Sequence, residues 1–126
     1  MITGSLTPDG VPVIRIDVAG TSWTAIIDTG FNGDLELPSR LQPLVNARFI
    51  CRNRSLLAAG QIIEEDTYAV DFPFDGQVRL AEATFAAHDE ILIGTHLLRE
   101  HRLEIDFPAG TVRLERAIRG QPGPAP

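Results

Sequence analysis

The sequence contains no lysine and a single cysteine among its 126 residues. Without lysine, it has neither an amine for Schiff-base chemistry nor the lysine of a phosphate-binding P-loop. Cys51 cannot form an intrachain disulfide, so we expect a fold that does not depend on an oxidising compartment. The net charge of −6 argues against a nucleic-acid partner, because binding to a phosphate backbone needs clustered positive charge.

Long apolar runs are also missing. No stretch approaches the roughly 18 apolar residues of a membrane span, and no charged segment followed by an apolar one marks the N-terminus. We therefore expect a cytoplasmic protein with no membrane partner. The chain length fits one domain over residues 1–116, followed by a disordered tail rich in proline and glycine over residues 117–126.

Short apolar segments separated by turn residues predict a mostly-β domain. Strands are expected at 13–18, 23–27, 49–57, 62–72, 78–86, 91–93, 103–107 and 111–115. The sequence "PFDG" at 73–76 predicts a turn. The short segment before Val11 is expected to be exposed and open to trimming.

One or two short helices complete the expected fold. The first is predicted at 39–45, where Ser39 could cap a helix with an apolar face. The second is predicted in "THLLREHR" after Gly94, over about two turns.

The stretch "AIIDTGFNGDLELP" raises a specific question, because an apolar β-branched run leads directly into Asp28. A lone ionised carboxylate at the end of a buried strand is costly. The Asp could simply be a turn residue, because an Asp side chain often accepts a nearby backbone N–H. It could also be one half of a pair of carboxylates that share a proton and act as general acid and base.

A second segment has a similar shape. Both "WTAIIDTG" and "DEILIGTH" bring a short apolar strand to a glycine, which suggests two related halves whose backbones approach closely at the centre of a packed barrel.

Three features together resemble a retropepsin-like (clan AA) aspartic protease of the small, single-domain bacterial type. They are the triplet Asp28-Thr29-Gly30 behind an apolar strand, a hairpin tip at Ala59-Gly60, and "ILIG" followed by "LL". The resemblance implies a retropepsin-like acid-protease barrel with one half-site per chain. It further implies a C2 homodimer in which two copies of Asp28 activate a water for hydrolysis of a peptide or protein substrate, with no metal or other cofactor.

The resemblance also implies roles for individual residues. Asp28 would be the catalytic carboxylate, Thr29 would bond to the partner chain and stiffen the pair, and Gly30 would let backbone and substrate approach. A flap, the hairpin that closes over an extended substrate, and its subsites would comprise Leu57, Ala58, Ala59, Gly60, Gln61, Ile62 and Ile93.

The sequence departs from the retroviral pattern at two positions. Where an arginine and an acidic partner commonly stand, this chain has Thr95 and Asn32, with Asp34 and Arg99 nearby as possible substitutes. Two other functions therefore remain open. One is a dimeric peptide-binding or scaffold module with weak catalysis, and the other is a monomeric β-barrel ligand binder in which Asp28 is structural.

Overall fold

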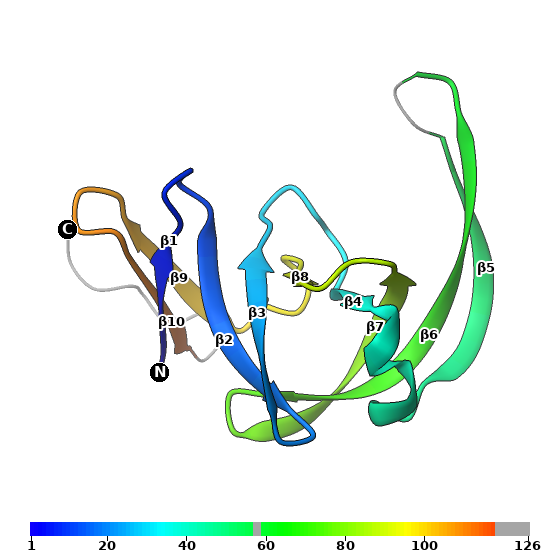
Figure 1. The fold of residues 1–126 in the computed structure, drawn as a ribbon, viewed down its shortest axis with the longest axis horizontal. Helices are drawn as coiled ribbons and strands as arrows, with labels where there is room; N and C mark the ends of the chain where they lie inside the picture. The colour runs from blue at the N-terminus through cyan, green and yellow to red at the C-terminus, as the bar shows by residue number, and fades with distance from the viewer. Residues whose placement is uncertain (57–58, 118–126) are drawn as a thin grey trace.

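The computed structural model describes residues 1–56 and 59–117, which form one ten-stranded sheet and one short 3₁₀ helix. The strands lie in the order β5-β6-β7-β4-β8-β3-β2-β1-β10-β9 (Figure 1). In chain order the elements are β1 Ile2–Leu6, β2 Pro12–Val18, β3 Thr21–Ile27, β4 Leu35–Pro38, η1 Ser39–Leu44, β5 Arg48–Leu56, β6 Ile62–Phe74, β7 Gln77–Ala86, β8 Ile91–Ile93, β9 His101–Asp106 and β10 Thr111–Arg116. The predicted mostly-β fold is confirmed.

The hairpin β2–β3 follows directly from the sequence pattern. Ile14, Ile16 and Val18 are buried, whereas the residues between them are exposed, as expected for a strand with one face on a core. The turn residues Ala19 and Gly20 both have positive φ, 50° and 83°, which suits the twist of a tight hairpin. This hairpin delivers β3 to the centre of the sheet.

One hydrophobic core draws buried side chains from most of the strands. Its fully buried members with the largest side chains are Phe72, Ile14, Leu35, Leu37, Leu41, Ile91, Ile93, Leu97, Leu114, Val18, Val45 and Val70. The central strands β3, β4 and β8 all contribute, so the elements that lead to Asp28 are anchored by close packing.

The hairpin β5–β6 behaves differently from the rest of the sheet. No residue of β5 is buried, and the outer part of the hairpin extends beyond the core, on the same side of the molecule as the loop that follows β3 (Figure 1). Its strands pair from Arg48 with Ala69 to Leu56 with Ile62, with a bulge between Phe49 and Cys51. Because few apolar contacts hold its outer part, this hairpin is suited to local movement.

No strand was predicted before Val11, but the structure has one. Residues 2–6 form β1, which pairs with β10 and with the start of β2. Gly4 allows this approach, since a Cβ at that position would overlap with the carbonyl oxygen of Val13.

Of the two predicted helices, only the first is present, as the 3₁₀ helix η1. It lacks the predicted cap, because Ser39 makes no side-chain capping hydrogen bond, and Leu44 is exposed rather than packed. The helix predicted after Gly94 was wrong: the chain makes turns there, in which Leu98 and His101 donate to carbonyls three residues earlier. His101 already begins β9, so too few residues remain for a helix of two turns.

Two smaller points concern the boundaries of predicted segments. The turn predicted at 73–76 falls at Asp75 and Gly76, while Pro73 and Phe74 still belong to β6. Of the predicted tail, Ala117 donates its N–H to the carbonyl of Glu100, and residues 118–126 lie outside the described residues.

Within the described part of the chain, no helix has the length and apolar character needed to cross a bilayer.

Candidate active site

The two similar sequence segments lie side by side at the centre of the sheet. Strands β3 and β8 pair in parallel, with Ala25 opposite Ile91 and Ile27 opposite Ile93. Just beyond this pairing, the backbone N–H of Asp28 donates to the carbonyl of Ile93 at 2.9 Å. The ladder between the strands therefore leads directly to the carboxylate singled out in the sequence.

Asp28 is half-buried, and the next two residues, Thr29 and Gly30, are exposed. Its Oδ1 accepts the backbone N–H of Gly30 at 3.0 Å, and its carbonyl accepts the N–H of Phe31 at 3.1 Å. Among the described residues, no partner donates to Oδ2. The carboxylate thus has the local turn bond expected of an Asp in a turn, and one oxygen remains available.

Gly30 lies against this carboxylate. A Cβ at residue 30 would stand 3.3 Å from Oδ1 of Asp28, which is tight for a carbon–oxygen contact. The glycine therefore leaves the approach to the carboxylate open.

The turn after β8 holds the loop 28–34 from the other side. Thr95 donates its N–H to the carbonyl of Phe31 at 2.8 Å, and His96 donates to the carbonyl of Gly33 at 3.2 Å. At Gly94 a Cβ would overlap with the carbonyl oxygen of Gly33, so the close approach of the two segments requires glycine there. The predicted close packing of backbones at this glycine is confirmed.

The predicted flap lies at the tip of the β5–β6 hairpin. Ala59, Gly60 and Gln61 are exposed, and Gly60 has a φ of 79°, which favours glycine. Ile62 begins β6 with 57% of its surface exposed and stands opposite Leu56, which is 75% exposed. Leu57 and Ala58 lie outside the described residues.

No family model matches this sequence, and a search of the curated proteins also finds no match. Solved structures do match. A retropepsin-like aspartic protease from Rickettsia conorii has 18% sequence identity and a TM-score of 0.64 over 90% of this chain and 88% of that chain. The protease of simian foamy virus (mac) has 21% identity and a TM-score of 0.55 over 69% of this chain and 91% of that chain.

The chain has a retropepsin-like fold. A foamy viral protease-reverse transcriptase matches as well, with 18% identity and a TM-score of 0.56 over 74% of this chain and 16% of that much longer one.

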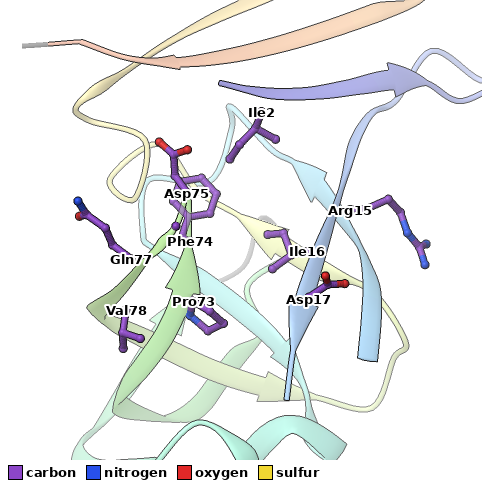
Figure 2. Close-up of a pocket in the computed structure, with 10 residues that line it drawn as sticks. Ile2, Arg15, Ile16, Asp17, Pro73, Phe74, Asp75, Gln77 and Val78 are labelled. Atoms are coloured by element: carbon purple, nitrogen blue, oxygen red, sulfur yellow. The ribbon is translucent and has the colours of Figure 1, made fainter. Parts of the chain in front are cut away.

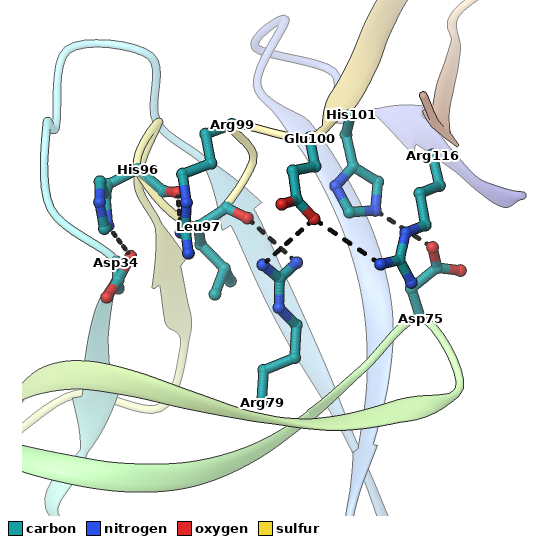
Figure 3. Close-up of polar contacts among 9 residues, drawn as sticks. All are labelled: Asp34, Asp75, Arg79, His96, Leu97, Arg99, Glu100, His101 and Arg116. Atoms are coloured by element: carbon teal, nitrogen blue, oxygen red, sulfur yellow. Dashed lines mark hydrogen bonds and ion pairs between the residues drawn. The ribbon is translucent and has the colours of Figure 1, made fainter. Parts of the chain in front are cut away.

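Asn32 and Thr95 stand where the retroviral pattern commonly has an acidic residue and an arginine. Close to them in the structure, a carboxylate and a histidine are in contact. Asp34 is buried, and its Oδ1 lies 2.6 Å from Nδ1 of His96 (Figure 3). Arg99, which the sequence suggested as a substitute, instead donates to the carbonyl of His96 at 2.7 Å. The sequence motifs did not single out His96, although its place two residues after Gly94 puts it next to the site loop.

Ile93 differs from its predicted role. It has no exposed surface and packs in the core, so its side chain cannot contact a substrate in this chain. It reaches the site through its carbonyl oxygen, which accepts the N–H of Asp28. On the other face of the same strands, Ile26 and Leu92 are half-buried and stand opposite each other.

A separate cavity of about 460 Å³ lies between the first two strands and the β6–β7 turn (Figure 2). It is lined by Ile2, Arg15, Ile16, Asp17, Pro73, Phe74, Asp75, Gly76, Gln77 and Val78, none of which is a predicted site residue. Among residues 1–56 and 59–117, no group of three His, Cys, Asp or Glu side chains could hold a metal ion.

Proposed function

We propose that this protein is a homodimeric aspartic endopeptidase that hydrolyses peptide bonds in extended substrates. The observation that carries the proposal is the position of Asp28. In this retropepsin-like fold, Asp28 directly follows the central strand β3. Its backbone N–H is bonded to the carbonyl of Ile93, and one oxygen of its carboxylate has no donor among the described residues. The triplet Asp28-Thr29-Gly30 supplies one half-site.

A second copy of the chain would supply the other half. Two adjacent carboxylates cannot easily both be ionised, so such a pair shares one proton. The sequence contains one Asp-Thr-Gly triplet, and a C2 dimer would place two copies of Asp28 across the symmetry axis. Thr29 is exposed, as it must be if its hydroxyl is to bond to the partner chain.

The proposed reaction needs only a water molecule and this pair. The ionised carboxylate takes a proton from the water, whose oxygen attacks the peptide carbonyl, while the protonated carboxylate donates to the carbonyl oxygen. Collapse of the resulting tetrahedral species breaks the C–N bond as the nitrogen receives a proton. No covalent enzyme intermediate is formed.

The hairpin β5–β6 would act as the flap. An extended substrate can pair with a hairpin through backbone hydrogen bonds, and closure then excludes water from the scissile bond. Residues 57–61, together with the exposed apolar pair Leu56 and Ile62, would contact the substrate. On the floor of the site, Ile26 and Leu92 replace Ile93 as the apolar side chains open to contact.

A diverse peptide library, read by mass spectrometry between about pH 4 and pH 7, tests the proposal. The wild-type chain should cut a defined set of peptides, and Asp28→Asn should cut none of them. Asp17→Asn is the matched control, because Asp17 is an exposed carboxylate of β2 that takes no part in the proposed reaction.

Two results would contradict the proposal. Cuts that persist in Asp28→Asn would show that another group, or a contaminant, does the chemistry. A wild-type protein that is dimeric and binds extended peptides without cutting them would be a peptide-binding or scaffold module instead.

A further inference from the structure

Asp34 is a buried carboxylate at the end of the loop that carries Asp28. It is only 7% exposed. Its Oδ1 lies 2.6 Å from Nδ1 of His96, and its Oδ2 accepts the backbone N–H of Glu82 at 2.9 Å. A buried carboxylate is costly without such partners, so these contacts fix both its position and its orientation.

Through these contacts, Asp34 joins three segments. The parallel pairing of β4 with β7 begins with Leu35 opposite Ala83, so the carboxylate accepts the N–H of the residue just before the first pair. The carbonyl of Asp34 also accepts the N–H of Gly94 at 2.9 Å. Side chain and backbone therefore hold this end of the loop against both β7 and the turn after β8.

His96 contacts the loop twice. Its N–H donates to the carbonyl of Gly33 at 3.2 Å, and its ring reaches Asp34 (Figure 3). The other end of the loop is held by the bond from Asp28 to Ile93. One end of the loop is thus held by the last residue of β8, and the other end by the turn that follows β8.

From this geometry we propose that Asp34 and His96 are positioning residues, which hold the 28–34 loop so that the Asp28 carboxylate faces its counterpart and the attacking water. The inference rests on the proposed function of Asp28. In this scheme neither residue takes part in the chemical step, although both line a cavity of about 540 Å³ beside the loop. Their contribution comes from placement, because reacting groups that are displaced by about 1 Å can lose about a hundredfold in rate.

The same chain provides a matched control. Asp75 and His101 form a second carboxylate–histidine pair, with Oδ2 and Nε2 3.1 Å apart, at the β6–β7 turn (Figure 3). The described contacts of this pair do not involve the loop 28–34. Removing the carboxylate of Asp75 shows how much stability and activity are lost when a carboxylate–histidine pair away from the loop is broken.

The experiment compares the full-length variants Asp34→Ala, His96→Ala and Asp75→Ala with the wild type, all well below their melting temperatures. For Asp34→Ala we expect kcat to fall about tenfold or more while KM stays within about twofold, because the chemistry rather than the binding is misaligned. His96→Ala should change kcat in the same direction. Asp75→Ala should lower thermal stability without this loss of kcat.

Hydrogen exchange provides a readout that does not depend on activity. The amides of Asp28, Phe31 and Thr95 should exchange faster in Asp34→Ala and His96→Ala than in the wild type, and at the wild-type rate in Asp75→Ala. If the wild type cuts no peptide, the proposed function fails, and exchange alone still decides whether the loop is held in this way.

His96 is more than half exposed, so His96→Ala should fold even if Asp34→Ala does not. Unchanged exchange in the loop, or an equal loss of kcat in the Asp34 and Asp75 variants, would overturn the proposal.

Discussion

The backbone N–H of Asp28 donates to the carbonyl of Ile93, and this bond joins the ends of β3 and β8 at the proposed catalytic carboxylate. Two apolar strands far apart in the sequence thereby position one polar group. The fully buried side chain of Ile93 anchors the acceptor in the core. Substitutions of the two glycines near this bond should therefore have different effects, one on the stability of the fold and the other on the activity.

Gly94→Ala should damage the fold, whereas Gly30→Ala should spare the fold and damage activity. At residue 94 the added Cβ overlaps with the backbone of Gly33, so we expect a loss of stability of about 3 kcal/mol. At residue 30 the added Cβ meets only the side chain of Asp28, at 3.3 Å. Thermal melting together with peptide cleavage would check both, and equal effects of the two substitutions would contradict this description of the site.

Leu56→Ser should raise KM for peptides with little effect on stability. Leu56 is 75% exposed next to the tip of the proposed flap, so its loss should change the free energy of unfolding by less than about 0.5 kcal/mol. Val78→Ser is the control, since Val78 is 74% exposed on β7, outside the flap. A similar rise in KM for both variants would indicate that the flap is not the substrate-contacting element.

The pH dependence of stability should include a contribution from Asp71. Hydrogen bonds from Asn46 and then from Arg48 lower the pKa of Asp71 below its usual 3.8. A carboxyl group whose pKa is lower in the folded state stabilises the protein above about pH 4, and this stabilisation is lost as the pH falls through the folded-state value. Asp71→Asn should therefore reduce the drop in melting temperature on acidification below about pH 4.

The distances behind this prediction are 2.9 Å from Asn46 Nδ2 and 3.2 Å from Arg48 Nη2 to the carboxylate of Asp71. Asn46→Ala removes one of these hydrogen bonds and leaves those from Arg48, so its melting temperature should show an intermediate dependence on pH. If the melting temperatures of wild type and Asp71→Asn fall in parallel from pH 7 down to about pH 2, this contribution is ruled out.

The sequence was sufficient to predict most strands, because alternating burial and turn residues are local signals. It did not reveal β1. The segment "ITGSL" has Gly and Ser in place of apolar residues, and it becomes a strand only because β10 and β2 flank it. The need for Gly4 is visible only once Val13 is known to lie against it.

The candidate site was predictable in part, for the same reason. Asp28 and Gly30 lie in one short motif, and Gly94 ends a recognisable apolar strand. The contact between Asp34 and His96 joins residues 62 positions apart, so no local pattern could indicate it. The helix predicted after Gly94 failed because Leu97 and Leu98 are buried from turns that lead into β9, not from a helical face.

The pairing of two Asp28 carboxylates is tested most directly by subunit mixing. Wild-type and Asp28→Asn chains would be mixed in varied proportions, allowed to exchange subunits, and assayed on a peptide that the wild type cuts. If activity needs both carboxylates, it should fall as the square of the wild-type fraction, to about one quarter in an equal mixture. A linear fall, to about one half, would show that each chain acts alone and would contradict the shared site.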